Sequence, residues 1–92
     1  MIKTFCCADT EILFRGVRVA RFVNIEKIAM RKLAMLNRAL TLNDLRIPPG
    51  NCLESLVGNR AGQYSIRVND RYRVCFRFEC GDADDVEIVD YH

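Results

Sequence analysis

Two runs of alternating apolar and polar residues, separated by a short turn, constrain the fold of this chain most. The runs cover residues 64–68 and 72–78, and Asn69-Asp70-Arg71 lies between them. An apolar residue at every second position is typical of a strand with one buried face, and Asn and Asp favour turns. The pattern therefore predicts a β-hairpin.

The alternation also predicts which side chains share a face of the hairpin. Facing Val68 with Val74 and Ile66 with Phe76 requires an odd-numbered loop and keeps the apolar side chains together. The opposite face then collects three basic side chains and one thiol, namely Arg67, Arg73, Cys75 and Arg77.

An amphipathic helix is predicted before the hairpin. It starts from Asn24, a favourable N-cap, and runs for about four turns. Its apolar positions fall at helical spacing: Ile25, Ile28, Ala29, Leu33, Leu36 and Leu40. Arg31, Lys32 and Arg38 lie off that stripe, so the helix has one face for the core and one basic face.

The remaining elements are shorter. We expect a strand at 2–6, followed by a helix over 11–14 that Asp9 or Thr10 caps and Gly16 ends. A capping box is expected at 41–44, and the segment 48–50 should end all helix. A last strand is expected after the Gly81-Asp82 turn. This order predicts an α+β fold in which helices cover one face of a twisted antiparallel sheet, and the other face is free for a ligand. The length of 92 residues predicts a single domain, 1–92.

The charges are divided unevenly along the chain. Residues 1–78 contain 14 basic and 6 acidic residues, whereas 79–92 contain 6 acidic residues and no Lys or Arg. Eleven of the 14 bases are Arg, whose planar fork suits phosphate. An anionic partner such as nucleic acid is one interpretation. The alternative is that the sheet arginines pair with the acidic end, with Glu87 as a candidate partner.

The cysteine pattern and the absence of apolar runs bear on compartment and cofactors. Five cysteines, with no Cys-x-x-Cys pair, argue against a disulfide framework and a zinc site. No signal peptide is evident, and no stretch approaches the roughly 20 apolar residues of a membrane span. We therefore expect a cytoplasmic protein without membrane association. Neither a P-loop nor a dinucleotide fingerprint is present, so we expect no cofactor.

The sequence Asp90-Tyr91-His92 follows the last predicted strand and contains the single histidine. Histidine exchanges protons near neutral pH, and a phenol can donate to developing negative charge. The alternative for His92 is a solvated side chain at the chain end, and the alternative for Tyr91 is an aromatic residue of an edge strand. Arg60, in the loop Gly58–Gly62, is either a phosphate contact or a solvated side chain.

Two long segments, 53–76 and 86–92, resemble the HigB-type toxins, a branch of the RelE and ParE superfamily of bacterial toxin-antitoxin systems. The resemblance also includes 7–11, 31–36, 44–46 and 48–50, so it runs nearly from end to end.

This resemblance implies a compact fold of helices against an antiparallel sheet. It also implies an endoribonuclease that cuts mRNA in the A site of the 70S ribosome without metal, arrests growth and is silenced by a HigA-type helix-turn-helix antitoxin. The family's catalytic set maps onto Arg73, Asp90, Tyr91 and His92. Arg60 falls on the arginine of the family's Gly-Asp-Arg stretch and, with Arg67 and Arg77, is an expected RNA contact. Relatives on the same fold bind DNA gyrase instead, so a non-enzymatic toxin that binds gyrase or the ribosome is the alternative.

The chain departs from the family pattern near this site. Val57 stands where many members have lysine, and Glu54 is the closest match to a histidine that some members carry. Tyr72 stands where tryptophan is common, which we interpret as core packing.

Overall fold

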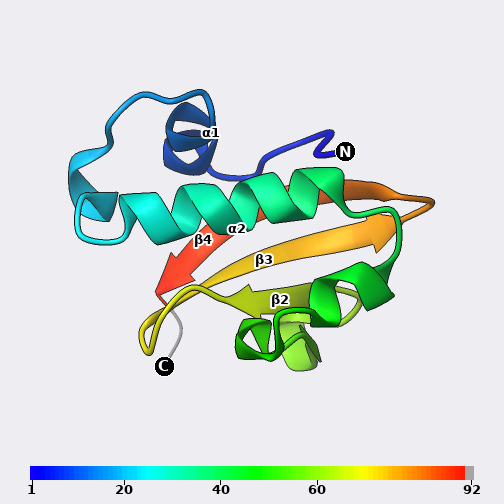
Figure 1. The fold of residues 1–92 in the computed structure, drawn as a ribbon. Coiled ribbons are helices and arrows are strands. Elements are labelled where there is room, and N and C mark those ends of the chain that lie inside the picture. Colours follow the sequence, from blue (N-terminus) through cyan, green and yellow to red (C-terminus); the bar gives the residue numbers. More distant parts are fainter. Residues whose placement is uncertain (91–92) are drawn as a thin grey trace.

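Four antiparallel strands form one sheet in the order β1-β2-β3-β4, and two helices cover one of its faces (Figure 1). A computed structural model describes residues 1–90. The helices are α1 (Ala8–Phe14) and α2 (Glu26–Arg38), and the strands are β1 (Glu54–Ser55), β2 (Tyr64–Arg67), β3 (Tyr72–Glu79) and β4 (Asp82–Asp90). Single turns of 3-10 helix are η1 (Ala20–Phe22), η2 (Leu42–Arg46), η3 (Pro49–Asn51) and η4 (Gly58–Arg60). The α+β class is as predicted.

The predicted hairpin is confirmed as β2 and β3, but its predicted register is wrong by two residues. Ile66 pairs with Val74 and Tyr64 pairs with Phe76, whereas the alternation had suggested that Val68 faces Val74. Because the shift is an even number of residues, every side chain keeps its predicted face.

A tight turn causes the shift in register. The N–H of Val68 donates to the carbonyl of Tyr72 at 3.0 Å, so the loop contains only residues 69–71. The side-chain oxygen of Asn69 accepts hydrogen bonds from the N–H groups of Arg71, at 2.9 Å, and Tyr72, at 2.8 Å. This side-chain bridge closes the turn, and the apolar pattern does not reveal it.

The predicted amphipathic helix is confirmed as α2, with corrections at both ends. Ile25 occupies the N-cap position without a side-chain cap, so Asn24 does not cap the helix. Ala39 has extended backbone after the last helical residue, and Leu40 beyond it is 77% exposed. Ile28 is 39% exposed, so it was also wrongly assigned to the core. The other four residues of the predicted stripe are buried: Ile25, Ala29, Leu33 and Leu36.

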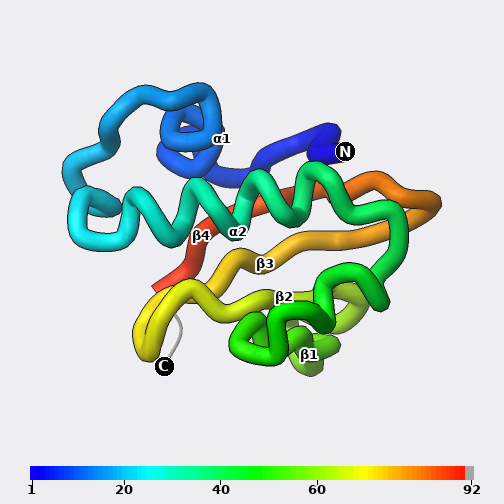
Figure 2. Tube along the Cα trace, viewed as in Figure 1, coloured from blue at the N-terminus to red at the C-terminus, as the bar shows by residue number. Residues whose placement is uncertain are grey.

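Figure 2 shows α2 lying over the sheet, and the buried apolar side chains of the core pack between them. The largest fully buried apolar side chains come from η1, α2, η2 and three strands: Phe22, Leu33, Leu36, Leu45, Ile66, Val74, Phe76, Val86 and Ile88. Burying one such side chain contributes about 1.5–3 kcal/mol. The helix and the sheet are therefore held in one arrangement by shared apolar burial.

Residues 1–6 run alongside β4, parallel to it. Isolated bridges join Ile2 to Ala83 and Phe5 to Val86, so the predicted strand at 2–6 is reduced to two bridges. The reason lies in β4, where Asp85 has a left-handed φ of 53°. Its N–H donates to the Thr4 hydroxyl at 2.8 Å rather than to a backbone carbonyl. The ladder is thereby interrupted between the two bridges.

The shorter helical elements follow the prediction in part. Helix α1 begins at Ala8 after Cys7, earlier than the predicted caps. The hydroxyl of buried Thr10 accepts a hydrogen bond from the N–H of Ile88 at 3.0 Å, which anchors α1 to β4. Gly16 follows the end of α1 with a φ of 91°, as expected of a glycine that stops a helix.

The capping box is confirmed at the start of η2, where the Thr41 hydroxyl and the Asp44 carboxylate each accept a backbone N–H of the other residue. The prediction that no helix follows 48–50 is wrong. The 3-10 turn η3 begins within that segment, and a second 3-10 turn, η4, comes after it. No helix within residues 1–90 is long and apolar enough to cross a membrane.

Candidate functional site

Arg73, on the sheet face away from α2, is enclosed by three partners. Its Nε donates to the Ser65 hydroxyl at 2.8 Å, and one terminal nitrogen donates to the Cys52 carbonyl at 2.5 Å. The other terminal nitrogen lies 2.8 Å from Oε1 of Glu54, and only 12% of the Arg73 side chain is exposed. A guanidinium held on all its nitrogens has a fixed orientation, which suits a group that recognises an anion.

The sheet face around Arg73 is less open than predicted. Ser65 and Cys75 on this face have no exposed surface. The segment 52–63 reaches this face, since Glu54 pairs with Arg73 and Arg60 pairs with Glu87 of β4. The expected free face is therefore partly covered by the chain itself.

The other predicted basic contacts are paired with carboxylates. Arg67 stands opposite Arg73 in the register and forms an ion pair with Asp70 of the turn. Arg77 lies 3.3 Å from Asp85. The carboxylates of Asp70 and Asp85 are 99% and 49% exposed. Such exposed pairs contribute at most about 1 kcal/mol, so an incoming anion can replace the carboxylate.

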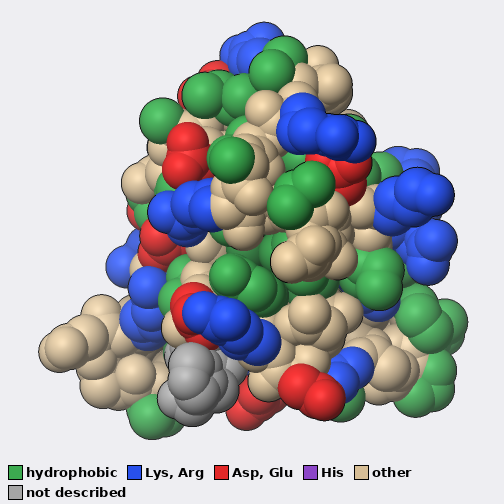
Figure 3. Space-filling view, turned by 90° about the vertical axis from the view of Figure 1, so that its left-hand side faces the viewer, with side chains coloured by type: hydrophobic (Ala, Val, Ile, Leu, Met, Phe, Trp, Pro, Cys, Tyr) green, Lys and Arg blue, Asp and Glu red, His purple; other side chains and the backbone are tan. Residues whose placement is uncertain are grey.

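Arg60, and not an arginine of the sheet, is the residue that pairs with Glu87. Its guanidinium lies 2.8 Å from the Glu87 carboxylate and 3.1 Å from the amide oxygen of Gln63. The hydrogen bond to Glu87 raises the pKa of Arg60. Figure 3 shows the wider pattern on one side of the molecule, where several Lys and Arg side chains lie beside Asp and Glu side chains.

Arg73 and Asp90 lie on different faces of the sheet. In the register of β3 and β4, Arg73 pairs with Val89 and Tyr72 pairs with Asp90, and neighbouring residues of a strand face opposite sides. The Asp90 carboxylate lies 2.8 Å from the Arg71 guanidinium. The predicted site residues Tyr91 and His92 lie outside the described residues.

Two thiols lie close to the Arg60–Glu87 pair. Burial and the Glu87 carboxylate raise the pKa of Cys6 from 9.0 to about 11, and burial raises the pKa of Cys75. Both thiols are therefore protonated at neutral pH and are poor nucleophiles. In the part of the chain that the structure describes, no three His, Cys, Asp or Glu side chains gather as a metal site.

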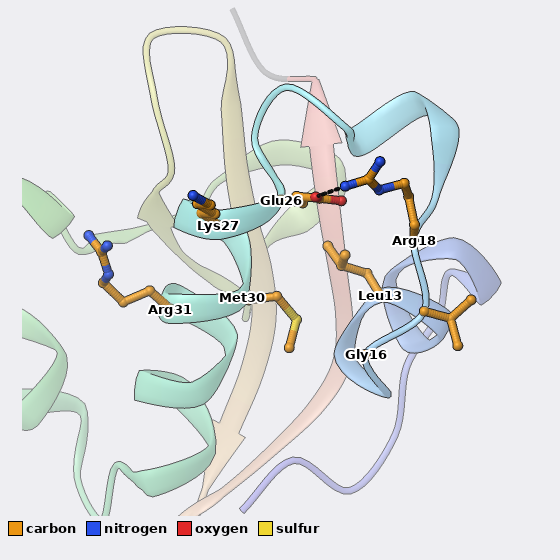
Figure 4. Close-up of a pocket in the computed structure, with 8 residues that line it drawn as sticks. Leu13, Gly16, Arg18, Glu26, Lys27, Met30 and Arg31 are labelled. Carbon is orange, nitrogen blue, oxygen red and sulfur yellow. Dashed lines mark hydrogen bonds and ion pairs between the residues drawn. The ribbon is translucent and has the colours of Figure 1, made fainter.

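A groove of about 560 Å³ lies elsewhere, between α1 and α2. Leu13 and Met30 point into it, and Arg18 pairs with Glu26 at its rim (Figure 4). None of the predicted site residues lines this groove. Arg73 and its neighbours remain the candidate site.

The family described as "RelE-like toxin of type II toxin-antitoxin system HigB" matches residues 17–92. The chain belongs to this HigB-like toxin family. The match contains Arg73 and every other predicted site residue.

Two proteins with sequences similar to this HigB-like chain illustrate the relationship. "Toxin HigB-1" of Vibrio cholerae serotype O1 (strain ATCC 39315 / El Tor Inaba N16961) is 50% identical over 60 residues, which are 65% of this chain and 63% of the relative. An uncharacterized protein of Haemophilus influenzae (strain ATCC 51907 / DSM 11121 / KW20 / Rd) is 40% identical over 63 residues, 68% of this chain and 62% of that protein. The matched segment thus spans less than two thirds of either relative.

Of the two departures from the HigB pattern, only Glu54 has a described contact with Arg73. Glu54 supplies the carboxylate that pairs with Arg73. Val57 precedes η4 and is 85% exposed, so an apolar side chain faces solvent where many family members have lysine.

Sequence reasoning missed two partners that orient Arg73. Ser65 is opposite Cys75 in the register, and its hydroxyl accepts from Arg73. The alternation already placed position 65 on the basic face, so a polar residue there was a detectable signal. The Cys52 carbonyl gave no signal, because its place depends on how the segment after η3 folds back.

Proposed function

We propose that this chain is the toxin of a type II toxin-antitoxin system and acts as a metal-independent endoribonuclease. It would cut mRNA in the A site of the 70S ribosome, inhibit translation and arrest growth in the cytoplasm. A HigA-type helix-turn-helix antitoxin would silence it. The observation that carries the proposal is a HigB-like family match that includes a guanidinium fixed on the basic sheet face, that of Arg73.

The proposed reaction is attack by a ribose 2′-hydroxyl on the adjacent phosphorus, which only RNA allows. The bond from the 2′-oxygen to phosphorus forms as the bond to the 5′-oxygen breaks, leaving a 2′,3′-cyclic phosphate. His92 takes the hydroxyl proton, because Asp90 lies on the other face of the sheet from Arg73, and Tyr91 or His92 gives a proton to the departing 5′-oxygen. Arg73 stabilises the charge that develops on the phosphate, an effect that typically accelerates a reaction about 10²–10³-fold.

Arg73 must exchange partners for this step to occur. In the free protein its guanidinium is paired with Glu54, whose side chain is 51% exposed. A phosphate would take the place of that carboxylate, while Ser65 and the Cys52 carbonyl continue to orient the guanidinium. The ribosome contributes by placing the message, which reduces the entropic cost of alignment.

The first experiment is mRNA cleavage in a reconstituted translation reaction, mapped by primer extension. We expect codon-phased cuts with the natural chain and none with His92→Gln or Arg73→Gln. Arg15→Gln is the matched control, because Arg15 is an exposed residue at the end of α1 and, within residues 1–90, pairs only with Glu11. Growth arrest without any cut would contradict the nuclease proposal.

Val57 favours a second candidate function, a non-enzymatic toxin that binds DNA gyrase or the ribosome. Its side chain is 85% exposed and apolar, which suits a protein contact better than a phosphate contact. A binder would tolerate Tyr91→Ala and deletion of residues 90–92, whereas a nuclease would lose its toxicity. Growth assays with folded variants distinguish the two functions.

A further inference from the structure

A buried asparagine holds one lysine of α2 in place. Lys32 Nζ donates to the side-chain oxygen of Asn51 at 2.5 Å, and Asn51 has no exposed surface. The amide nitrogen of Asn51 donates to the Leu45 carbonyl at 3.1 Å and to the sulfur of Met35 at 3.0 Å. Since both ends of the amide are bonded, Asn51 is fixed and in turn fixes the ammonium group.

The charges of two further cations act on this ammonium group. Burial and the charges of Arg31 and Arg67 lower the pKa of Lys32. We call Arg31, Lys32 and Arg67 the edge cluster, because Arg67 ends β2 at a position where β1 no longer pairs with that strand. Arg31 is one of the residues that line the groove between α1 and α2, and Figure 4 shows its side chain leaving α2 on the side away from Leu13.

The edge cluster has little negative charge to balance it. Among residues 1–90, neither Arg31 nor Lys32 forms an ion pair, and Arg67 pairs only with Asp70, which is 99% exposed. Three neighbouring cations with one solvated carboxylate repel one another. An anion bound between them would relieve this repulsion and accept charge-assisted hydrogen bonds.

The edge cluster adjoins Arg73 through two structural links. Arg67 and Arg73 are direct cross-strand partners, which places their Cα atoms roughly 4.5–5.5 Å apart. In addition, Asn51 holds Lys32, and Cys52, the next residue, holds Arg73. One short segment therefore sets the positions of a cation in each group.

We propose that Arg31, Lys32 and Arg67 bind a phosphodiester group of single-stranded RNA next to the phosphate that Arg73 contacts. This subsite rests on the proposed function, and it assigns an RNA-binding role to α2. It would fix the register of the strand relative to Arg73 without reading the bases.

The test is binding of a fluorescent 2′-O-methyl RNA dodecamer, measured by anisotropy over a series of salt concentrations. Methylated 2′-oxygens cannot attack phosphorus, so binding is measured without cleavage. Lys32→Gln removes the charge but keeps a donor for Asn51. Lys27→Gln is the matched control, since Lys27 is an exposed lysine of the same helix and forms no ion pair with the described residues.

We expect Lys32→Gln to weaken binding about tenfold, the effect of losing one charge-assisted hydrogen bond. The slope of log affinity against log salt should become shallower by about 0.7, the value for one single-strand phosphate contact. Lys27→Gln should change affinity less than about twofold, because an exposed charge at a distance is screened. Lys32→Arg should retain most of the affinity.

Equal affinities and slopes for the Lys32→Gln and Lys27→Gln variants would overturn the subsite, as would a natural chain that does not bind the dodecamer. If Lys32→Gln fails to fold by circular dichroism, Arg31→Gln at an exposed position gives the same comparison. A natural chain that binds the dodecamer but never cuts mRNA would contradict the nuclease and leave the subsite standing. Cleavage with unchanged binding by Lys32→Gln would overturn the subsite alone.

Discussion

At the scale of single residues, Arg73 is the arginine of the sheet that the protein itself covers most. Its side chain is 12% exposed, against 39% for Arg67 and 48% for Arg77. Removing a buried guanidinium leaves its acceptors unpaired, which costs about 1–3 kcal/mol. Loss of activity in an Arg73 variant must therefore be compared with its stability, and Glu54 offers a cleaner change.

Glu54→Gln is expected to strengthen RNA binding about two- to fivefold. The substitution removes the carboxylate that competes with phosphate for Arg73, and an ion pair with an exposed partner contributes up to about 1 kcal/mol. Anisotropy with the 2′-O-methyl dodecamer measures the change. Glu79→Gln is the control, because Glu79 is an exposed residue at the far end of β3. Equal gains from the two variants would indicate a general charge effect.

Cys6 is expected to react slowly with iodoacetamide although it is an exposed residue. Its pKa is raised from 9.0 to about 11, so at pH 8 its thiolate is about 100-fold scarcer than that of an ordinary cysteine. Mass spectrometry across a pH series gives the midpoint of alkylation. Glu87→Gln should move that midpoint downward, because the Glu87 charge is one cause of the shift. A midpoint near 9 in the natural chain would contradict this prediction.

At the scale of elements, α2 shows how far an apolar pattern can be trusted. Leu33 and Ile28 both fall on the predicted stripe, yet Leu33 has no exposed surface and Ile28 is 39% exposed. Helical spacing identifies a face of the helix but not where the neighbouring elements stop covering it. The core under α2 is supplied by β3 and β4, whose extent the helix sequence does not encode.

Leu33→Ala is expected to destabilise the protein by about 2–5 kcal/mol, through lost apolar burial and the cavity left behind. Ile28→Ala should cost less than about 1 kcal/mol, because its side chain is already in contact with water. Urea unfolding monitored by circular dichroism measures both values. Similar losses of unfolding free energy in the two variants would mean that Ile28 is buried as the sequence predicted, and not exposed as the structure has it.

For the strands, the sequence predicted which side chains share a face of the sheet, but it did not predict which residues pair across the strands. Alternation placed Arg67 and Arg73 on one face, and an even shift could not change that. The register itself depends on Asn69, whose side chain tightens the turn. In the same way, the pairing of Asp90 with Arg71 and of Glu54 with Arg73 depends on tertiary placement. The charge distribution along the sequence suggested that arginines pair with carboxylates, but it did not identify which residues pair.

At the scale of the whole molecule, residues 1–6 protect one edge of the sheet. Four backbone hydrogen bonds of 2.8–3.2 Å join this segment to Ala83 and Val86 of β4. An uncovered strand edge presents unpaired N–H and carbonyl groups on which other chains can add. The segment therefore contributes to solubility as well as to stability.

Deleting residues 1–6 is expected to lower the melting temperature and to cause association that increases with protein concentration. Thermal melts and light scattering measure the two effects. Lys3→Ala is the control, because it keeps the backbone hydrogen bond to Ala83 and changes only an exposed side chain. A deleted form that stays monomeric at high concentration would show that the β4 edge needs no cover.

The contact between residues 1–6 and β4 joins parts of the chain about 80 positions apart. Translation produces the first segment early and β4 after every other described element, so the nascent chain cannot complete its core until β4 has been made. Contacts of such long sequence separation also form slowly. Arg73 gains its neighbours on β4 at the same late point. A chain with this topology therefore completes both its core and the surroundings of Arg73 only after β4 has been made.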